Sequence, residues 1–198
     1  MFELHFITKV YNLIKASLLF WLYLCKGFVV YGFVPAICGI VTVIDTIGKD
    51  SKENEVSVRE LYRESYAQYQ HLTLFSFFAS IFLILSYVSL YFINATKTNT
   101  VTLLVTIILL YLLAIFIVTL SYSIYFIVFF KKQPKQAFIY GFLTAVKNIF
   151  VSVILLAILY GFFYIATINL LLFIVSFPAV YGYIIVALLG KVKRMEVK

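Results

Sequence analysis

The segment CKGFVVYGFVPAICG, Cys25–Gly39, lies in the first long apolar run of this 198-residue chain and interrupts it. It places Lys26 among apolar residues, and Gly27, Gly32 and Pro35 follow soon after. Glycine weakens a helix through its backbone freedom, and proline lacks an N–H and clashes with the carbonyl four residues earlier. The segment therefore predicts a helix that is broken near Gly32 and Pro35.

The composition of the chain assigns it to a class. Apolar residues make up 64% of it, aromatic residues 19% and charged residues only 12%, with a mean hydropathy of +1.06. This is too little polar surface for a water-soluble globule, so we expect a single all-α transmembrane domain over residues 1–198. Because a span needs ~20 apolar residues, the apolar runs predict about five spans, at 17–44, 72–93, 101–130, 149–167 and 170–189.

The distribution of basic residues predicts the orientation. Segments 45–71, 131–147 and 190–198 hold four lysine or arginine residues each, whereas 94–100 holds only Lys97. Short basic connections stay on the cytoplasmic side. The pattern thus predicts a multi-pass protein of a bacterial inner membrane with its C-terminus in the cytoplasm. The net charge of +8 is explained by this bias and requires no nucleic acid.

The first run, 17–44, has two possible paths. As one broken crossing, it places Lys9 and Lys15 outside; as a hairpin that turns back at the glycine and proline residues, it keeps both lysines in the cytoplasm. The mixed polar start and the length of the run predict no cleavable signal peptide. Both paths fit the sequence.

Lys26 is the charge that needs an explanation. A lysine at mid-depth costs ~3 kcal/mol on insertion scales, so its ammonium must find polar partners. We expect residues 31–35 to form a non-helical break buried among the other spans, and Lys26 to point to carbonyls, hydroxyls or a polar cavity. Its role is then either structural or a contact with an anionic lipid or substrate.

Two polar segments precede spans and have amphipathic patterns. In VSVRELYRESYAQYQ, residues 56–70, Ser57 and Glu60 have capping-box spacing, and apolar and tyrosine side chains share one face. The opposite face carries Arg59, Glu60, Arg63 and Glu64, and it lies either on the membrane interface or against a cytoplasmic partner. A second such helix is predicted at 134–148, where Phe138 and Phe142 align with Tyr62 and Tyr66 and suggest a repeated unit.

The residues that carry chemistry are sparse. No aspartate or glutamate occurs between Glu64 and Glu196, which disfavours an ion-coupled carrier. His5 and His71 are isolated, and Cys25 and Cys38 are expected to be buried free thiols. The sequence predicts no enzyme, cofactor or metal site. The small pairs Gly141/Ala145 and Ala157/Gly161 predict helix packing, and Pro178 predicts a kink in the last span.

The segment NLIKASLLFWLYLCKGFVVYGFVPAICGIVTVI, Asn12–Ile44, resembles the N-terminal signature of the YesL-like family of bacterial membrane proteins. Trp21, Gly27, Gly32, Pro35 and Ala36 follow that order, and VRELYRESYAQYQ and QAFIYGFLTAVKN are similar to later helices of the family. Lys26 departs from the pattern. The resemblance implies an association with carbohydrate uptake loci, but it carries over no binding or catalytic residue.

Two hypotheses about function follow. In the first, the chain is an accessory or scaffold protein beside a carbohydrate ABC transporter, with membrane lipids, transporter subunits or further copies of itself as partners. In the second, it is a small stand-alone carrier of a solute or lipid, with Lys26 contacting an anionic group.

Overall fold

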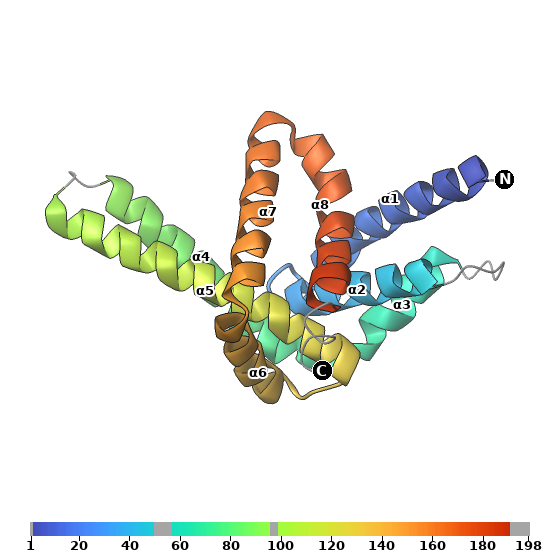
Figure 1. Ribbon diagram of the computed structural model, residues 1–198, viewed down its shortest axis with the longest axis horizontal. Coiled ribbons are helices and arrows are strands. Elements are labelled where there is room, and N and C mark those ends of the chain that lie inside the picture. Colours follow the sequence, from blue (N-terminus) through green and yellow to red (C-terminus); the bar gives the residue numbers. More distant parts are fainter. Residues whose placement is uncertain (1, 50–56, 96–98, 191–198) are drawn as a thin grey trace.

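Helices form every element of the computed structural model in the residues that it describes, 2–49, 57–95 and 99–190 (Figure 1). The elements are α1 (Phe2–Lys26), α2 (Phe33–Lys49), α3 (Val58–Gln68), η1 (Gln70–Leu72), α4 (Thr73–Ala95), α5 (Thr100–Phe130), α6 (Pro134–Lys147), α7 (Ile149–Ile168), α8 (Leu170–Ile184) and the π-helical turn η2 (Ile185–Leu189). Some of the basic residues that predict the orientation lie outside the described residues. They include Lys97 and those of segment 191–198.

Four helical segments are long and apolar enough to cross a membrane. They are Gln70–Ala95, Thr100–Phe130, Ile149–Ile168 and Leu170–Leu189. They coincide with four of the predicted spans, and they make the chain an integral membrane protein of the helical class. The predicted polar turn between the last two spans is present, since the Asn169 side chain accepts the N–H of Leu172 at 3.0 Å and so caps α8.

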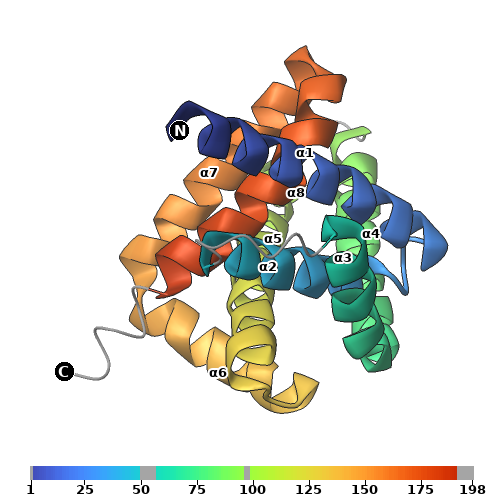
Figure 2. The same ribbon diagram turned by 90° about the vertical axis from the view of Figure 1, so that its right-hand side faces the viewer.

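The predicted first span, 17–44, is divided between two helices. α1 and α2 run side by side in opposite directions, joined by a turn at residues 27–32 (Figures 1 and 2). The chain therefore turns back, and the single broken crossing was wrong. Neither α1 nor α2 is among the four helices of crossing length and apolarity.

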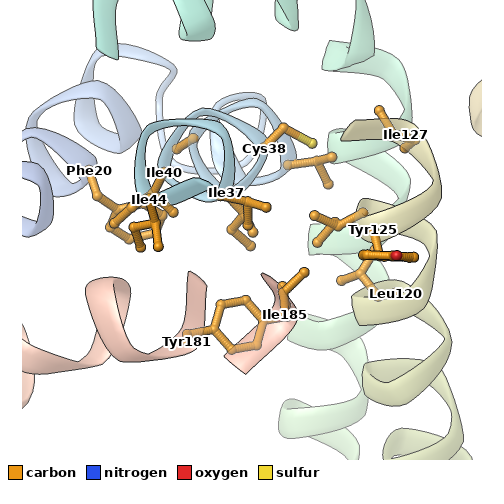
Figure 3. Close-up of a cluster of buried hydrophobic side chains, with 14 of the residues drawn as sticks. Phe20, Ile37, Cys38, Ile40, Ile44, Leu120, Tyr125, Ile127, Tyr181 and Ile185 are labelled. Carbon is orange, nitrogen blue, oxygen red and sulfur yellow. The ribbon is translucent and has the colours of Figure 1, made fainter. Parts of the chain in front are cut away.

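α2 forms the centre of the core. Every residue from Val34 to Val41 is buried, and the helix contacts α1, α3, α4, α5 and α8. Figure 3 shows side chains of α2, α5 and α8 meeting in this core. A helix that is apolar on all sides needs either a protein core or lipid around it, and α2 is enclosed by protein.

The α5 helix packs along only half of its length. Its residues from Val118 to Tyr125 are all buried, whereas no residue in 100–117 is buried. The α4–α5 hairpin accordingly projects away from the body of the molecule, and it diverges from the α7–α8 hairpin (Figure 1). The outer half of α5 thus packs against α4 on one side, where the centres of the Phe82 and Phe116 rings lie 4.2 Å apart, and exposes apolar side chains on its other sides.

The helix ends follow local signals in two cases and depart from them in one. Asn99 and Thr102 form a capping box at the start of α5, and Pro134 occupies the first turn of α6. Ser57, by contrast, makes no side-chain cap at α3. The capping box predicted there is therefore not formed, and the Ser57 carbonyl alone accepts the first N–H groups.

One of the two predicted small-residue pairs brings helices together. Gly141 and Ala145 of α6 are buried, and a Cβ added at Gly141 would lie 2.6 Å from Ser123 Oγ on α5 and 2.9 Å from the Thr119 carbonyl. Ala157 and Gly161 of α7 are instead exposed, and nothing lies within 4 Å of a Cβ at Gly161. The second packing prediction is wrong for contacts within this chain.

We expect Gly141→Ala to destabilise the protein by about 1–3 kcal/mol, because the added methyl group must displace backbone atoms of α5. Gly161→Ala is the matched control, since the same methyl group enters open space and favours the helix. Thermal unfolding in detergent should show a lowered midpoint for the first variant only. Equal midpoints for both variants would contradict the close approach of α5 and α6.

Candidate functional site

The turn between α1 and α2 has a defined hydrogen-bond pattern. The N–H of Phe28 donates to the Cys25 carbonyl at 3.0 Å, and the N–H of Val29 donates to the Leu24 carbonyl at 2.9 Å. These are the two bonds of a Schellman motif, which ends a helix and satisfies its last carbonyls. Phe28 and Val29 adopt φ angles of 52° and 60°, a left-handed conformation that costs L-residues about 1–3 kcal/mol each.

The two glycines allow the ends of the turn to touch. A Cβ at Gly27 would lie 2.3 Å from the Gly32 Cα and 2.9 Å from the Tyr66 hydroxyl. Neither glycine has a positive φ, so close approach, rather than an unusual φ, requires them. Pro35 lies within the first turn of α2, where a missing N–H leaves no helical bond unmade.

The break therefore differs from the prediction in position and in burial. It occupies residues 27–32 rather than 31–35, and Phe28, Val29 and Tyr31 are exposed rather than buried. Burial among other spans was expected because unpaired backbone is not tolerated in lipid. Here the Schellman bonds and two serines of α4 satisfy the backbone instead.

Those serines tie the turn to α4. Ser76 Oγ accepts the N–H of Val34 at 3.1 Å and donates to the Val30 carbonyl at 2.7 Å, and Ser80 Oγ donates to the same carbonyl at 3.1 Å. The residue before α2 is Gly32, which has no side chain to cap the helix. Ser76 supplies that cap from a different helix.

We expect Ser76→Ala to lower the free energy of unfolding by about 1–3 kcal/mol, because a buried N–H loses its partner. Ser86→Ala is the control: Ser86 is also buried in α4, but its hydroxyl bonds only to the Phe82 carbonyl of its own helix. Chemical or thermal unfolding in detergent measures the difference. A change of equal size in both variants would contradict a cap supplied across helices.

A second interhelical clamp lies around Pro178 in α8. Pro178 cannot donate to the carbonyl of Ile174, and the indole Nε1 of Trp21 donates to that carbonyl at 2.8 Å. The N–H of Ala179 donates to Ser17 Oγ at 3.2 Å. Two side chains of α1 thus satisfy the backbone around Pro178.

Lys26 lies on the surface at the end of α1. Its side chain is exposed, and Nζ lies 5.7 Å from the centre of the Tyr23 ring. The prediction that it would point to carbonyls, hydroxyls or a polar cavity is wrong. Its place in the last turn of α1 explains the difference, since a cation there complements the helix dipole and can reach solvent or headgroups.

Aromatic contacts fix α3 against the α1–α2 hairpin. Tyr23 stacks on Tyr62 with ring centres 5.1 Å apart, and the Tyr66 ring lies 4.8 Å from Tyr23. The buried hydroxyl of Tyr62 donates to the Ala36 carbonyl at 2.8 Å. The charged side chains of α3 lie on the other side and are exposed: Arg59, Glu60, Arg63 and Glu64. Their role in docking a partner stays a prediction.

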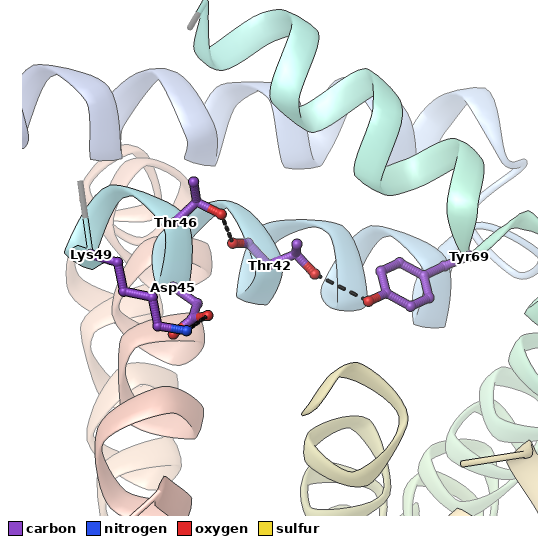
Figure 4. Close-up of polar contacts among 5 residues, drawn as sticks. All are labelled: Thr42, Asp45, Thr46, Lys49 and Tyr69. Carbon is purple, nitrogen blue, oxygen red and sulfur yellow. Dashed lines mark hydrogen bonds and ion pairs between the residues drawn. The ribbon is translucent and has the colours of Figure 1, made fainter. Parts of the chain in front are cut away.

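The C-terminal part of α2 carries polar side chains, and the acidic one, Asp45, is paired within the helix. Tyr69 contacts Thr42 through its hydroxyl at 3.3 Å, and Asp45 forms an ion pair with Lys49 one turn later (Figure 4). The Asp45 carboxylate is thus paired with a cation of its own helix.

Burial raises the pKa of the Tyr62 hydroxyl well above 10, with a smaller contribution from Tyr66. Because the folded-state pKa exceeds that of the unfolded chain, the neutral phenol contributes stability that is complete below about pH 10 and lost above it. We expect Tyr62→Phe to be less stable at neutral pH by about 0.5–1.5 kcal/mol. Its stability should also decline less steeply above pH 10.

The measurement is the unfolding midpoint in detergent from pH 7 to pH 11. The control is Tyr87→Phe, since Tyr87 is exposed, and it should follow the wild type throughout. Parallel pH profiles for Tyr62→Phe and the wild type would contradict the raised pKa.

The larger cavity lies between the two diverging hairpins and has a volume of about 300 Å³. Its lining comes from α1, α2, α4, α5, α7 and α8, and Tyr181 supplies its one hydroxyl group. A second cavity of about 280 Å³ lies among α5, α6 and α7, where Ser152 is the polar residue. The Oγ of Ser152 already donates to carbonyls of Ala145 and Asn148. Both cavities therefore suit apolar ligands.

Within the described ranges, no group of three or more His, Cys, Asp or Glu side chains could hold a metal ion. Cys38 is buried and Cys25 is exposed, both as free thiols. The expectation that both cysteines are buried was wrong for Cys25, which lies in the last turn of α1.

Comparison with known proteins adds no relative. No family model, curated protein or solved structure matches this chain. The resemblance to the YesL-like family stays a prediction.

Proposed function

We propose that this chain is an integral inner-membrane accessory or scaffold protein that binds other membrane proteins, rather than an enzyme. The carrying observation is the outer half of the α4–α5 hairpin, where no residue of 100–117 is buried. Large apolar side chains there, among them Leu104 at 54% and Tyr111 at 65%, are exposed. The sides of this helix pair that α4 and α5 do not cover for each other are free to contact neighbouring helices.

The exposed face of α3 supports the same proposal from the cytoplasmic side. Tyr62 and Tyr66 hold this helix against the hairpin, so Arg59, Glu60, Arg63 and Glu64 are presented on a fixed surface. Fixed charges of both signs favour a specific partner over a simple anionic lipid surface. The choice of a carbohydrate ABC transporter as partner rests on the resemblance of 12–44 to the YesL-like family.

A photoreactive residue placed at Leu104 tests the membrane surface. In native membranes from cells grown on the inducing glycan, we expect a discrete crosslink to a permease subunit. The same residue at Ile124, which is fully buried in the inner half of α5, is the control and should give no intermolecular product. Crosslinks to lipid alone, or only to a second copy of the chain, would contradict the accessory role.

Charge reversal tests the cytoplasmic surface separately. Because Arg63 is exposed, Arg63→Glu should reduce co-purification of the permease several-fold while leaving the unfolding midpoint unchanged. Lys135→Glu, at an exposed site on α6, is the matched control for net charge. Equal losses in both variants would indicate a general charge effect and contradict docking through α3.

The carrier hypothesis requires Lys26 to contact an anionic group of the solute or lipid, and the position of Lys26 does not favour such a contact. Lys26 is exposed beside Tyr23 and does not line either cavity. Flux of a polar solute through vesicles containing only this protein would nevertheless favour a carrier over a scaffold.

A further inference from the structure

The larger cavity has a lining without free hydrogen-bonding groups. The Tyr181 hydroxyl pairs with Ser121 Oγ at 2.8 Å, and the Ile174 carbonyl, which Pro178 leaves vacant, is taken by the indole of Trp21. A sugar or other polar ligand would therefore lose its own hydrogen bonds on entry. The occupant that this lining accepts without such a cost is a hydrocarbon.

The cavity extends from the protein surface to the core. Phe163 lies in its lining and is 67% exposed, while Leu120 and Ile40 line it at 4% and 0%. Phe163 belongs to one of the four helices of membrane-spanning length, so the mouth of the cavity opens where lipid tails surround the protein. A hydrocarbon occupant would make dispersion contacts along these walls.

We propose that this cavity binds one acyl chain of a membrane phospholipid. The chain enters beside Phe163 and lies along the aromatic side chains of α7 and α8 toward Ile40. The headgroup stays outside, because the lining offers it no polar partner. This inference goes beyond the scaffold function and does not depend on it.

Trp21 provides a built-in reporter for occupancy. It is the only tryptophan in the chain, and its ring lies 5.3 Å from Phe20 and 6.4 Å from Phe173. Both phenylalanines line the cavity. Bromine atoms on a bound acyl chain would therefore come close enough to quench its fluorescence.

The experiment titrates the purified protein in detergent micelles with phosphatidylcholine that carries dibrominated acyl chains. While the lipid is a minor part of the micelle, we expect Trp21 emission to fall to a plateau at about one lipid per protein. Unbrominated phosphatidylcholine should restore the emission. Phosphatidylglycerol with the same brominated chains should quench equally, because the cavity binds the acyl chain and makes no contact with the headgroup.

Two variants on α7 locate the site. Ala166 lines the cavity, so Ala166→Phe should remove the saturable quenching. Ala157 is exposed outside that lining, and Ala157→Phe should leave the quenching intact. Quenching that rises only in proportion to the brominated fraction, in wild type and both variants alike, would overturn the proposal. So would the absence of any quenching, as expected if a second protein chain covers the cavity.

Discussion

The fold depends on satisfying backbone groups wherever a helix is interrupted inside the apolar region. A free N–H or carbonyl there costs several kcal/mol, and this chain interrupts its helices at 27–32 and at Pro178. Each interruption is satisfied by side chains of a distant helix: Ser76 and Ser80 for the first, Ser17 and Trp21 for the second. The same few hydrogen bonds therefore close the backbone and fix which helices are neighbours.

This constraint also explains why the candidate surfaces are so apolar. The side chains of Trp21, Ser76 and Ser80, which could have lined a polar site, are hydrogen-bonded to the backbone instead. The lining of the larger cavity is almost entirely hydrocarbon, and the sides of the outer half of α5 that face away from α4 expose apolar side chains. Interaction with lipid tails and with other helices is the chemistry that such surfaces allow.

The sequence predicted the parts of the fold that depend on local composition. Four spans, the polar turn at Asn169 and the contact at Gly141 follow from hydropathy and small side chains, which are visible within a few residues. The turn at 27–32 was placed too late, because its left-handed residues are Phe28 and Val29 rather than glycine. No local propensity favours such a conformation. It persists because Ser76 and Ser80 hold the Val30 carbonyl.

The partners of each interruption could be identified only in three dimensions. Pro178 predicts that the Ile174 carbonyl lacks its helical hydrogen bond. Nothing in the sequence around Pro178 indicates that Trp21, 153 positions from Ile174, donates to this carbonyl. Lys26 was misplaced for a related reason: a hairpin turn takes it to the surface, whereas a continuous span would have buried it.

The separation between α1 and α8 has a consequence for biosynthesis. Ser17 and Trp21 are synthesised before the α8 backbone that they bond, since they precede it by 162 and 153 positions. During membrane insertion, α1 can already pack against α2 and α3 through Tyr23, while its indole and its Ser17 hydroxyl still lack these partners. The hydrogen bonds around Pro178 form only after α8 has been synthesised, and the contact between α1 and α8 is completed at that stage.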